Sequence, residues 1–522
     1  MPRQGERLAS SRLYRLAGGL SVGYLQAFVA ALAALWLTPY YLRHVGQQEF
    51  GLWLVSGQLL GYMALADLGI VALLPREIAH ATGSDSDDPE KVSRVISESS
   101  TVILWQLPLV AVLGGVAWML VGQRWPPLAS PFGFATLVLV LSFPLRMFAA
   151  ALQGLQDLAY LSAIQFFSWI ASVVVGVASV YAGFGLNGLV AGWAVTQLLV
   201  PAFAWRRLRQ RFPTALPGSM TMSWSTTGAT RLKRGLWVSL NQVAQVFLSG
   251  TDLIVVGWLL GPSAVVIYSC TARLATLLAS QPQMFMQMAV PALSELKAGA
   301  SRERLFDVAS TMSQAMLLCS GAIACLVLGV NRGFVQWWVG SEHYGGPLLT
   351  ALILLSMLLR HLNVGISYTL YSLGFERHLA VTAITDGVVT LLLMLPLLSF
   401  FGLAGAVLAP IAGVAVISLP SNVRALAGEA GISTVEALRP LASWSTRCAV
   451  LGAVILVAAT FIVPMGIWLV PAITVIAFAY GATMIPVMTT PPIGPHLTRI
   501  FTSIRAGATP LVRRIGLSAP NA

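Results

Sequence analysis

The feature that most constrains this chain is a series of long apolar segments that recurs along most of its length. Fourteen segments of 18 or more mostly apolar residues are separated by charged residues or by Gly and Pro. A segment of that length can cross the hydrocarbon core of a bilayer as a helix, whereas a barrel strand needs only about 9–11 residues. Because backbone N–H and C=O groups cannot remain unpaired in lipid, these segments are predicted to be transmembrane helices.

The composition excludes the main soluble classes. Of 522 residues, 57% are hydrophobic and only 10% are charged, which fits neither a cytosolic globular enzyme nor a disordered protein. The first apolar segment is too long for the hydrophobic region of a signal peptide, so we expect it to be retained as a helix. The predicted spans are 18–42, 51–74, 101–122, 132–153, 158–182, 186–205, 236–260, 264–290, 308–330, 346–371, 379–400, 402–423, 445–463 and 466–489.

The basic residues predict how these spans are oriented. Lys and Arg in short loops tend to stay on the cytoplasmic side of a membrane. If the N-terminus is cytoplasmic, 24 of the 31 basic residues lie on the inner side, three lie in outer loops and four lie within spans. An error in the helix count would move every later loop to the other side and remove this asymmetry. Both termini are therefore predicted to be cytoplasmic.

The two halves of the chain resemble each other at a nearly constant offset. Matching residues in 15–26 and 231–242 are 216 positions apart, and those in 184–190 and 401–407 are 217 apart. A third set of matches has an offset of 220. Because six helices separate the copies, both copies have the same orientation. The pattern predicts two parallel six-helix lobes related by an axis along the membrane normal, an arrangement that transporters use for alternating access.

The repeat also predicts the domain boundaries. The fold class is an all-α integral membrane protein with about 14 transmembrane helices. We expect an N-lobe at 1–205, a basic cytoplasmic linker at 206–235, a C-lobe at 236–423, two appended helices at 424–489 and a basic amphipathic cytoplasmic tail at 490–522.

Seven charged residues fall within the predicted spans, where each costs roughly 2.5–3.5 kcal/mol if it faces lipid. Asp252 and Arg273 lie at matched depth, about 12–14 Å below the outer surface at 1.5 Å per residue, and are predicted to pair. The pair fits a fixed link between neighbouring helices and an openable functional contact equally well. Arg447 lies near a helix end and is expected to extend its side chain to the interface.

The other buried polar residues are candidates for substrate binding or ion coupling. Arg360 lies near the membrane midplane and could bind a phosphate with two hydrogen bonds, and Arg146 could line an inward-facing cavity. Asp67 and Asp386 could carry a coupling proton, although a helix-to-helix hydrogen bond is the simpler role. Gln26 and Gln242 occupy equivalent repeat positions and would face the cleft between the lobes.

No cofactor or metal is expected. The six histidines show neither an HExxH spacing nor a cluster, and no GxxxxGK[ST] loop for ATP occurs. The four cysteines lie in or beside apolar segments without metal-ligand spacing, and no disulfide framework follows from them. An ion gradient, the membrane potential or a substrate gradient would have to drive any transport.

The chain also contains several local motifs: GQQEFGLW at 46–53, LADLGI at 65–70 with Arg76, ALQGLQ at 151–156, Thr251-Asp252 before Gly261-Pro262, Tyr268 and Arg273. With these motifs the chain resembles the multidrug/oligosaccharidyl-lipid/polysaccharide (MOP) exporter superfamily, in particular its polysaccharide-transporter, Wzx-like flippase branch. The resemblance runs from about residue 12 to 425. It implies two six-helix lobes around a cationic cavity in the inner membrane of a bacterium, and movement of an undecaprenyl-pyrophosphate-linked oligosaccharide from the inner to the outer leaflet.

The resulting hypothesis is a transporter, not an enzyme, that moves a lipid-linked oligosaccharide or polysaccharide precursor across the cytoplasmic membrane. Alternatives are a cation-coupled multidrug exporter of the same superfamily, a lipid II flippase and, with less support, an integral-membrane glycosyltransferase or polymerase. The expected partners are the lipid-linked glycan and membrane lipids. Glycosyltransferases and a glycan polymerase of the same pathway are further candidates, and nucleic acid is not expected.

Overall fold

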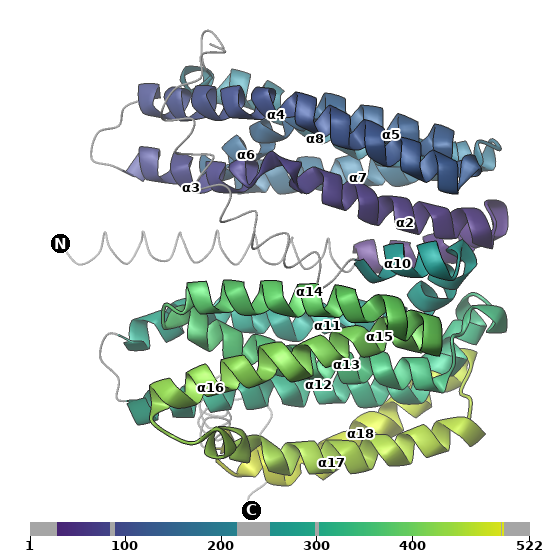
Figure 1. Ribbon diagram of the computed structural model, residues 1–522, viewed down its shortest axis with the longest axis vertical. Helices are drawn as coiled ribbons and strands as arrows, with labels where there is room; N and C mark the ends of the chain where they lie inside the picture. The colour runs from purple at the N-terminus through teal and green to yellow at the C-terminus, as the bar shows by residue number, and fades with distance from the viewer. Residues whose placement is uncertain (1–28, 84–88, 217–250, 298–301, 492, 495–522) are drawn as a thin grey trace, which may run out of the picture. The chain divides into compact units, whose positions relative to one another are not determined.

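The protein is a multi-pass helical membrane protein. The computed structural model describes residues 29–83, 89–216, 251–297, 302–491 and 493–494, and Figure 1 shows these ranges as helices joined by short connections, with no strand among them. Eleven helices in these ranges are long and apolar enough to cross a membrane, and a bent helix pair makes a possible twelfth. Each overlaps one predicted span, which confirms the all-α membrane fold. The spans 18–42 and 236–260 lie partly outside the described residues, so the total of 14 stays a prediction.

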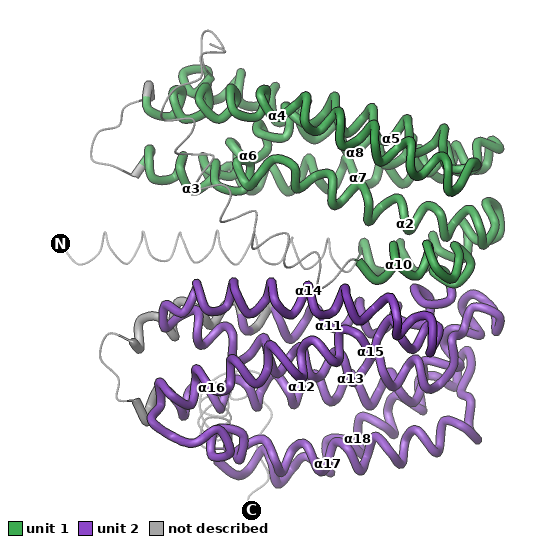
Figure 2. Tube along the Cα trace, in the orientation of Figure 1, with its two compact units in different colours: residues 1–266 green, residues 267–522 purple. Residues whose placement is uncertain are grey.

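Contacts divide the chain into two units, Met1–Val266 and Ile267–Ala522, which Figure 2 colours separately. The first described helix of the first unit covers residues 29–44. It is followed by α2 (Gln47–Ala64), α3 (Ile70–Gly83), α4 (Pro89–Arg124), α5 (Ala129–Ser142), α6 (Arg146–Gly154), α7 (Leu158–Tyr181), α8 (Gly185–Arg211) and α10 (Thr251–Leu259). The predicted lobe boundaries at 205 and 236 remain a proposal, and most of the linker between them lies outside the described residues.

Small residues bring the helices of the first unit close together. In the α7–α8 hairpin a Cβ atom added to Gly192 would meet the Ser172 carbonyl oxygen and the Gly176 backbone, and one added to Gly188 would meet the backbone of Ser179 and Val180. Helices in a membrane gain stability from close packing of this kind, because lipid leaves no hydrophobic driving force between apolar surfaces.

The second unit is built around α12. Its helices are α11 (Pro262–Lys297), whose first turn belongs to the first unit, α12 (Arg302–Trp338), α13 (Pro347–Ser372), α14 (Glu376–Phe401), α15 (Leu403–Gly413), a π-helical turn (Val414–Ser418), α16 (Leu419–Ala430), α17 (Thr434–Phe461) and α18 (Leu469–Thr489). The predicted appended pair corresponds to α17 and α18, which pack against α12. Trp444 donates to the Tyr480 hydroxyl (3.2 Å), and Tyr480 donates to the Leu318 carbonyl (2.7 Å).

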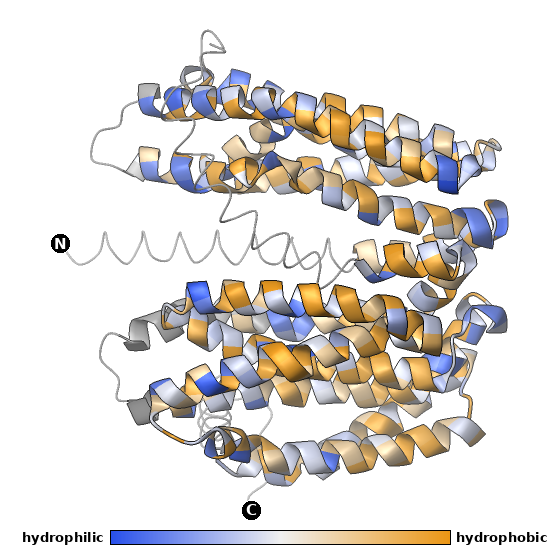
Figure 3. Ribbon diagram, viewed as in Figure 1, coloured by the Kyte–Doolittle hydropathy of each residue, from blue (hydrophilic) through white to orange (hydrophobic). Residues whose placement is uncertain are grey.

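The helices carry apolar side chains outward over their middle sections. Figure 3 shows hydrophobic residues concentrated along the middle of the helices and more hydrophilic residues toward their ends. Large apolar side chains such as Phe167, Leu392, Val454 and Phe478 are exposed. A soluble protein rarely exposes so many, whereas lipid is a suitable solvent for them.

Two local features differ from the uninterrupted spans expected from the sequence. The span predicted at 51–74 is broken into α2 and α3, which meet at an angle of 48°. The span predicted at 186–205 is longer than expected, because α8 continues to Arg211. The first residues of the predicted linker are therefore helical. The break between α2 and α3 creates the candidate site described next.

Candidate functional site

The break between α2 and α3 forms at the sequence Ala66-Asp67-Leu68-Gly69. Leu68 has φ 49° and Gly69 has φ 72°, so two consecutive residues adopt left-handed backbone conformations that cannot continue a helix. Glycine adopts this conformation without a steric penalty, and the Asp67 carboxylate stabilises the turn by accepting a hydrogen bond from the Gly69 N–H (3.1 Å). Asp67 is 5% exposed, so this hydrogen bond is shielded from solvent.

Side chains from neighbouring helices satisfy the carbonyl groups that the break releases. The Arg146 guanidinium donates to the Ala64 carbonyl oxygen (2.9 Å), and the Gln106 amide donates to the Asp67 carbonyl oxygen (3.1 Å). Irregular backbone at membrane depth is tolerated only where it is satisfied by protein or lines a cavity. Arg146 is placed by a short 3₁₀ turn at Phe143–Leu145, after which α6 begins.

A pocket of about 730 Å³ lies against this break, within the first unit. Helices α2, α3, α6, α7 and α8 contribute to its wall. Its polar lining residues are Asp67, Arg76, Arg146, Gln153, Gln165, Thr196 and Gln197. The apolar remainder includes Leu65, Val71, Leu161 and Val200. Asp67 and Arg146, which the sequence suggested separately, therefore line the same pocket, and the positive charge of Arg146 acts on Asp67.

The lining combines two kinds of donor with different chemistry. Arg76 and Arg146 present guanidinium groups, which bind phosphate oxygens with paired hydrogen bonds. The three glutamines present amides, which both donate and accept and so can bind hydroxyl-rich groups such as sugars. The pocket can therefore take a ligand that carries both phosphate and neutral polar groups.

Arg76 and the three glutamines were not predicted from the sequence to bind substrate, although Arg76 and Gln153 belong to the motifs that carry the family resemblance. Arg76 was counted among the basic residues of an inner loop, whereas it lies in α3 and lines the pocket. A signal for the glutamines existed, because each interrupts an otherwise apolar segment and polar residues in a span tend to face the protein interior. Gln153 lies seven residues after Arg146, on the same face of α6.

Asp386 forms a separate polar site in the second unit. Its carboxylate, 1% exposed, accepts hydrogen bonds from Thr390 (3.1 Å) and Ser418 (2.5 Å). Ser418 ends the π-helical turn Val414–Ser418, a type of turn that is frequent at functional sites. Gly413 allows the close approach of α15, since an added Cβ there would collide with Asp386 and Thr390. No basic residue pairs with Asp386 in the described part of the chain.

The remaining predicted site residues are distributed as follows. Arg273 lies on α11 and Arg360 on α13, and residues beside them, Ala275 and Met357, belong to one apolar cluster. Asp252 lies in the first turn of α10, where its carboxylate accepts a hydrogen bond from the Leu253 N–H (3.0 Å). Because Asp252 and Arg273 belong to different units, their pairing remains a prediction.

Gln26 and Gln242 lie outside the described residues, so their predicted position at the cleft is not tested. Among the described residues, no group of three or more His, Cys, Asp or Glu side chains could hold a metal ion. The candidate sites are therefore the pocket of the first unit, the hydroxyl-bonded carboxylate of Asp386, and the two arginines of the second unit.

The comparisons with known proteins agree with the architecture. A family model described as "Polysaccharide biosynthesis protein" matches residues 16–297, which is more than half of the chain. The fold is similar to that of a solved structure described as "Lipid II flippase MurJ, inward closed conformation", with 12% identity, a TM-score of 0.65 and coverage of 88% of this chain and 97% of that chain.

A second solved structure with a similar fold is an inward-facing multidrug resistance MATE family transporter of the MOP superfamily. It is 15% identical, with a TM-score of 0.51 and coverage of 78% of this chain and 96% of that chain. A comparison with curated protein sequences found no match.

Proposed function

The chain belongs to the family of polysaccharide biosynthesis proteins, and from this membership we propose that it translocates a polyprenyl-pyrophosphate-linked oligosaccharide or polysaccharide precursor across the cytoplasmic membrane by alternating access. The observation that carries this proposal is the pocket of the first unit, which is lined by Arg76, Arg146 and three glutamines. A pyrophosphate suits the arginines, and the sugar next to it suits the amides.

The helix break supports a binding role for the pocket. In transporters, discontinuous helices near the membrane interior often form the substrate site, because the break exposes backbone dipoles and side chains to a cavity. Arg146 uses one nitrogen on the Ala64 carbonyl, and a guanidinium has further donors in the same plane. The arginine can therefore stabilise the break and contact a ligand at the same time.

The same proposal assigns the other predicted residues. Arg273 and Arg360 would contribute cationic surface from the second lobe, and Gln26 and Gln242 would add polar contacts from the first helix of each lobe. Asp252, Asp67 and Asp386 are proposed for ion pairing or ion coupling, with Asp386 favoured for coupling because Asp67 already closes a turn. We further propose that both termini lie in the cytoplasm of a bacterium, and that glycosyltransferases and a polymerase of the same pathway are partners.

A lipid II flippase is the second candidate function. The similarity to the MurJ structure has a TM-score of 0.65, compared with 0.51 for the MATE transporter. Lipid II also joins a polyprenyl pyrophosphate to sugars, so the same pocket would suit it. Depletion of the protein separates the two candidates: loss of surface glycan with intact growth supports the first, and arrest of cell-wall synthesis supports the second.

Arginine substitutions in a strain that lacks the native gene test the site. We expect Arg146→Lys, Arg76→Ala, Arg273→Ala and Arg360→Ala each to reduce export of surface glycan by about 10- to 100-fold, the effect of losing a hydrogen bond to a charged group. Lysine at position 146 can still donate to the Ala64 carbonyl, so the break should persist. Export is measured as surface glycan at equal protein level.

Arg447→Ala is the matched control, because Arg447 is also an arginine in a predicted span but donates to the Thr483 carbonyl between the appended helices. It should leave export unchanged. If all four substitutions at Arg76, Arg146, Arg273 and Arg360 leave export unchanged, as Arg447→Ala should, the assignment of the site is wrong. If the deletion strain itself exports glycan and builds its cell wall normally, the proposed transport function is wrong.

A further inference from the structure

The end of the α7–α8 hairpin carries an unusual concentration of arginine. Four of the last six residues of α8 are basic, namely Arg206, Arg207, Arg209 and Arg211. We call these four residues the arginine cluster. The pocket described above includes residues of α8 only as far as Pro201, so the cluster is separate from it.

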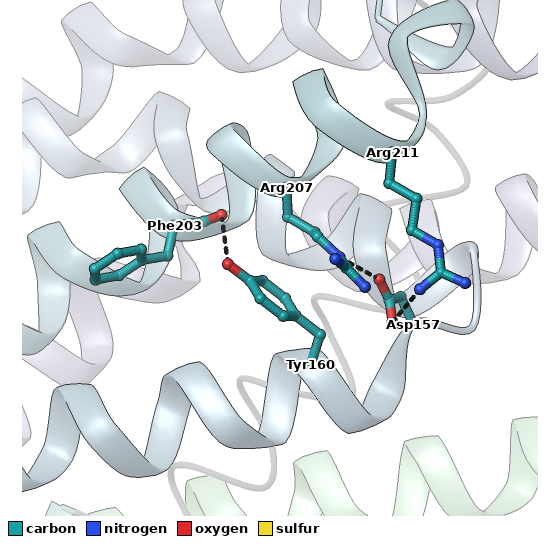
Figure 4. Close-up of polar contacts among 5 residues, drawn as sticks. All are labelled: Asp157, Tyr160, Phe203, Arg207 and Arg211. Atoms are coloured by element: carbon teal, nitrogen blue, oxygen red, sulfur yellow. Dashed lines mark hydrogen bonds and ion pairs between the residues drawn. The ribbon is translucent and has the colours of Figure 1, made fainter.

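One acidic residue holds half of the cluster in place. Asp157, directly before α7, accepts from Arg207 Nε (2.8 Å) and lies 3.5 Å from Arg211 Nη1, as Figure 4 shows. The Arg207 guanidinium lies over the Tyr160 ring, 4.5 Å from its centroid, and the Tyr160 hydroxyl approaches the Phe203 carbonyl at 3.5 Å. The Asp157 side chain is 10% exposed, so these contacts fix two arginines at a partly buried anchor.

The other two arginines face outward. Arg206 and Arg209 are exposed, and neither has an acidic partner in the part of the chain that the structure describes. Arg209 lies over the Trp205 ring, 5.5 Å from its centroid. With one Asp against four Arg, this end of the hairpin has a net charge of +3.

The cluster lies beside apolar side chains that would be unfavourable in water. Trp205 is 43% exposed and Phe203 is 39% exposed, and both lie within one turn of the arginines. Tryptophan and arginine together at the end of a membrane helix are typical of the boundary between headgroups and acyl chains. A soluble anion would satisfy the arginines but leave these rings uncovered, whereas a phospholipid covers both.

We propose that Arg206 and Arg209 of the arginine cluster bind the headgroup phosphate of an anionic phospholipid, with an acyl chain along Trp205. The planar guanidinium matches a phosphate group, and basic sites between membrane helices attract anionic lipids. Asp157 pairs with Arg207 and Arg211 on another face of α8, so Arg206 and Arg209 are the arginines with charge available for the lipid.

Native mass spectrometry of the purified full-length protein tests this site. The protein is exchanged into detergent that contains either phosphatidylglycerol or phosphatidylcholine, and the number of retained lipids is counted. Arg206→Gln with Arg209→Gln should weaken retention of phosphatidylglycerol about fivefold or more, because each surface arginine contributes to attraction of anionic lipid. Retention of phosphatidylcholine should stay low in both proteins.

Arg377→Gln with Arg439→Gln is the matched control. Both arginines are exposed, both lie on the membrane side predicted to be cytoplasmic, and each has an acid nearby, Glu376 and Glu436. This pair removes the same charge and should retain phosphatidylglycerol like the wild type. Melting temperatures in lipid-free detergent verify that all three proteins are folded.

The proposal is overturned if the 206/209 pair retains phosphatidylglycerol as the wild type does, or if the control pair loses it equally, which would mean attraction to overall charge. It is also overturned if inorganic phosphate at millimolar concentration displaces the lipid completely. None of these results depends on transport, so the lipid site and the proposed function can fail separately.

Discussion

Asp386 is a buried carboxylate in the second unit that we propose for ion coupling. It is 1% exposed, and its only hydrogen-bond donors in the described residues are the hydroxyls of Thr390 and Ser418. An ionised carboxylate in such a setting is expensive unless a proton or a cation compensates its charge. The residue can therefore join α14 to the π-helical turn in one state and take up a coupling ion in another.

We expect Asp386→Asn to lose glycan export while the protein remains folded. The amide keeps one oxygen acceptor for a hydroxyl, so the melting temperature should change by less than about 4 °C. It can neither release a proton nor hold a cation strongly, so the coupling step fails. Export and melting temperature are measured on the same preparations, with Thr390→Val as a control that keeps the carboxylate. Normal export by Asp386→Asn would leave Asp386 only its role in packing.

If the chain alternates between two lobes as proposed, the contact of α2 with α10 has to change during transport. Both belong to the first unit, yet the sequence repeat assigns α10 to the second lobe. Tyr62 and Thr251 share a hydrogen bond, and Gly51 allows the Pro262 backbone to approach α2. Close to this contact, Arg124 donates to the Trp258 carbonyl oxygen (3.1 Å). If the lobes alternate, this contact opens once in each cycle.

A disulfide between α2 and α10 should stop this opening. A Cβ atom built at Gly257 lies 3.9 Å from the Val55 Cβ atom, within the range of about 3.5–4.5 Å that a disulfide requires. We expect Val55→Cys with Gly257→Cys, in a chain without its four native cysteines, to lose export under oxidation and to regain it on reduction. Each single variant serves as a control. Export that continues with the disulfide formed would show that α2 and α10 move as one body.

At the scale of the whole molecule, charge distribution and helix number determine orientation. Twelve predicted spans overlap helices of the structure, and the other two lie partly outside the described residues. The bias of 24 basic residues to one side depends on this count. Ser341, in the turn between α12 and α13, and Thr214, after α8, are both exposed and fall on opposite sides in the predicted topology.

Cysteine labelling checks this topology. In a chain without native cysteines, Ser341→Cys should react with a membrane-impermeant maleimide in intact cells. Thr214→Cys should react only after the membrane is permeabilised. The expected difference is large because the bilayer excludes the charged reagent. The reverse pattern would invert the topology and place the proposed lipid site at the outer leaflet.

The sequence indicated some of the residues of the site but not their positions relative to one another. Asp67 and Arg146 stood out as charges within apolar segments, and both line the pocket. The sequence placed them 79 residues apart and contained no sign that a broken helix would bring them together. Gln165 and Gln197 were not singled out, and Gln153 was noted only as part of a family motif, because a glutamine in an apolar segment also fits an ordinary hydrogen bond between helices.

The sequence by itself determined the helical membrane fold, since segments of 18 or more apolar residues have no other way to satisfy their backbone in lipid. It also indicated the family, through local motifs that survive in the linear chain. Only the tertiary structure decided where the pocket lies and which arginines share an anchor. The pocket depends on side chains from five helices that meet at one helix break, and the anchor depends on the contact of Asp157 with Arg207. Both result from the packing of helices that are distant in sequence, so the spacing of residues along the chain does not reveal them.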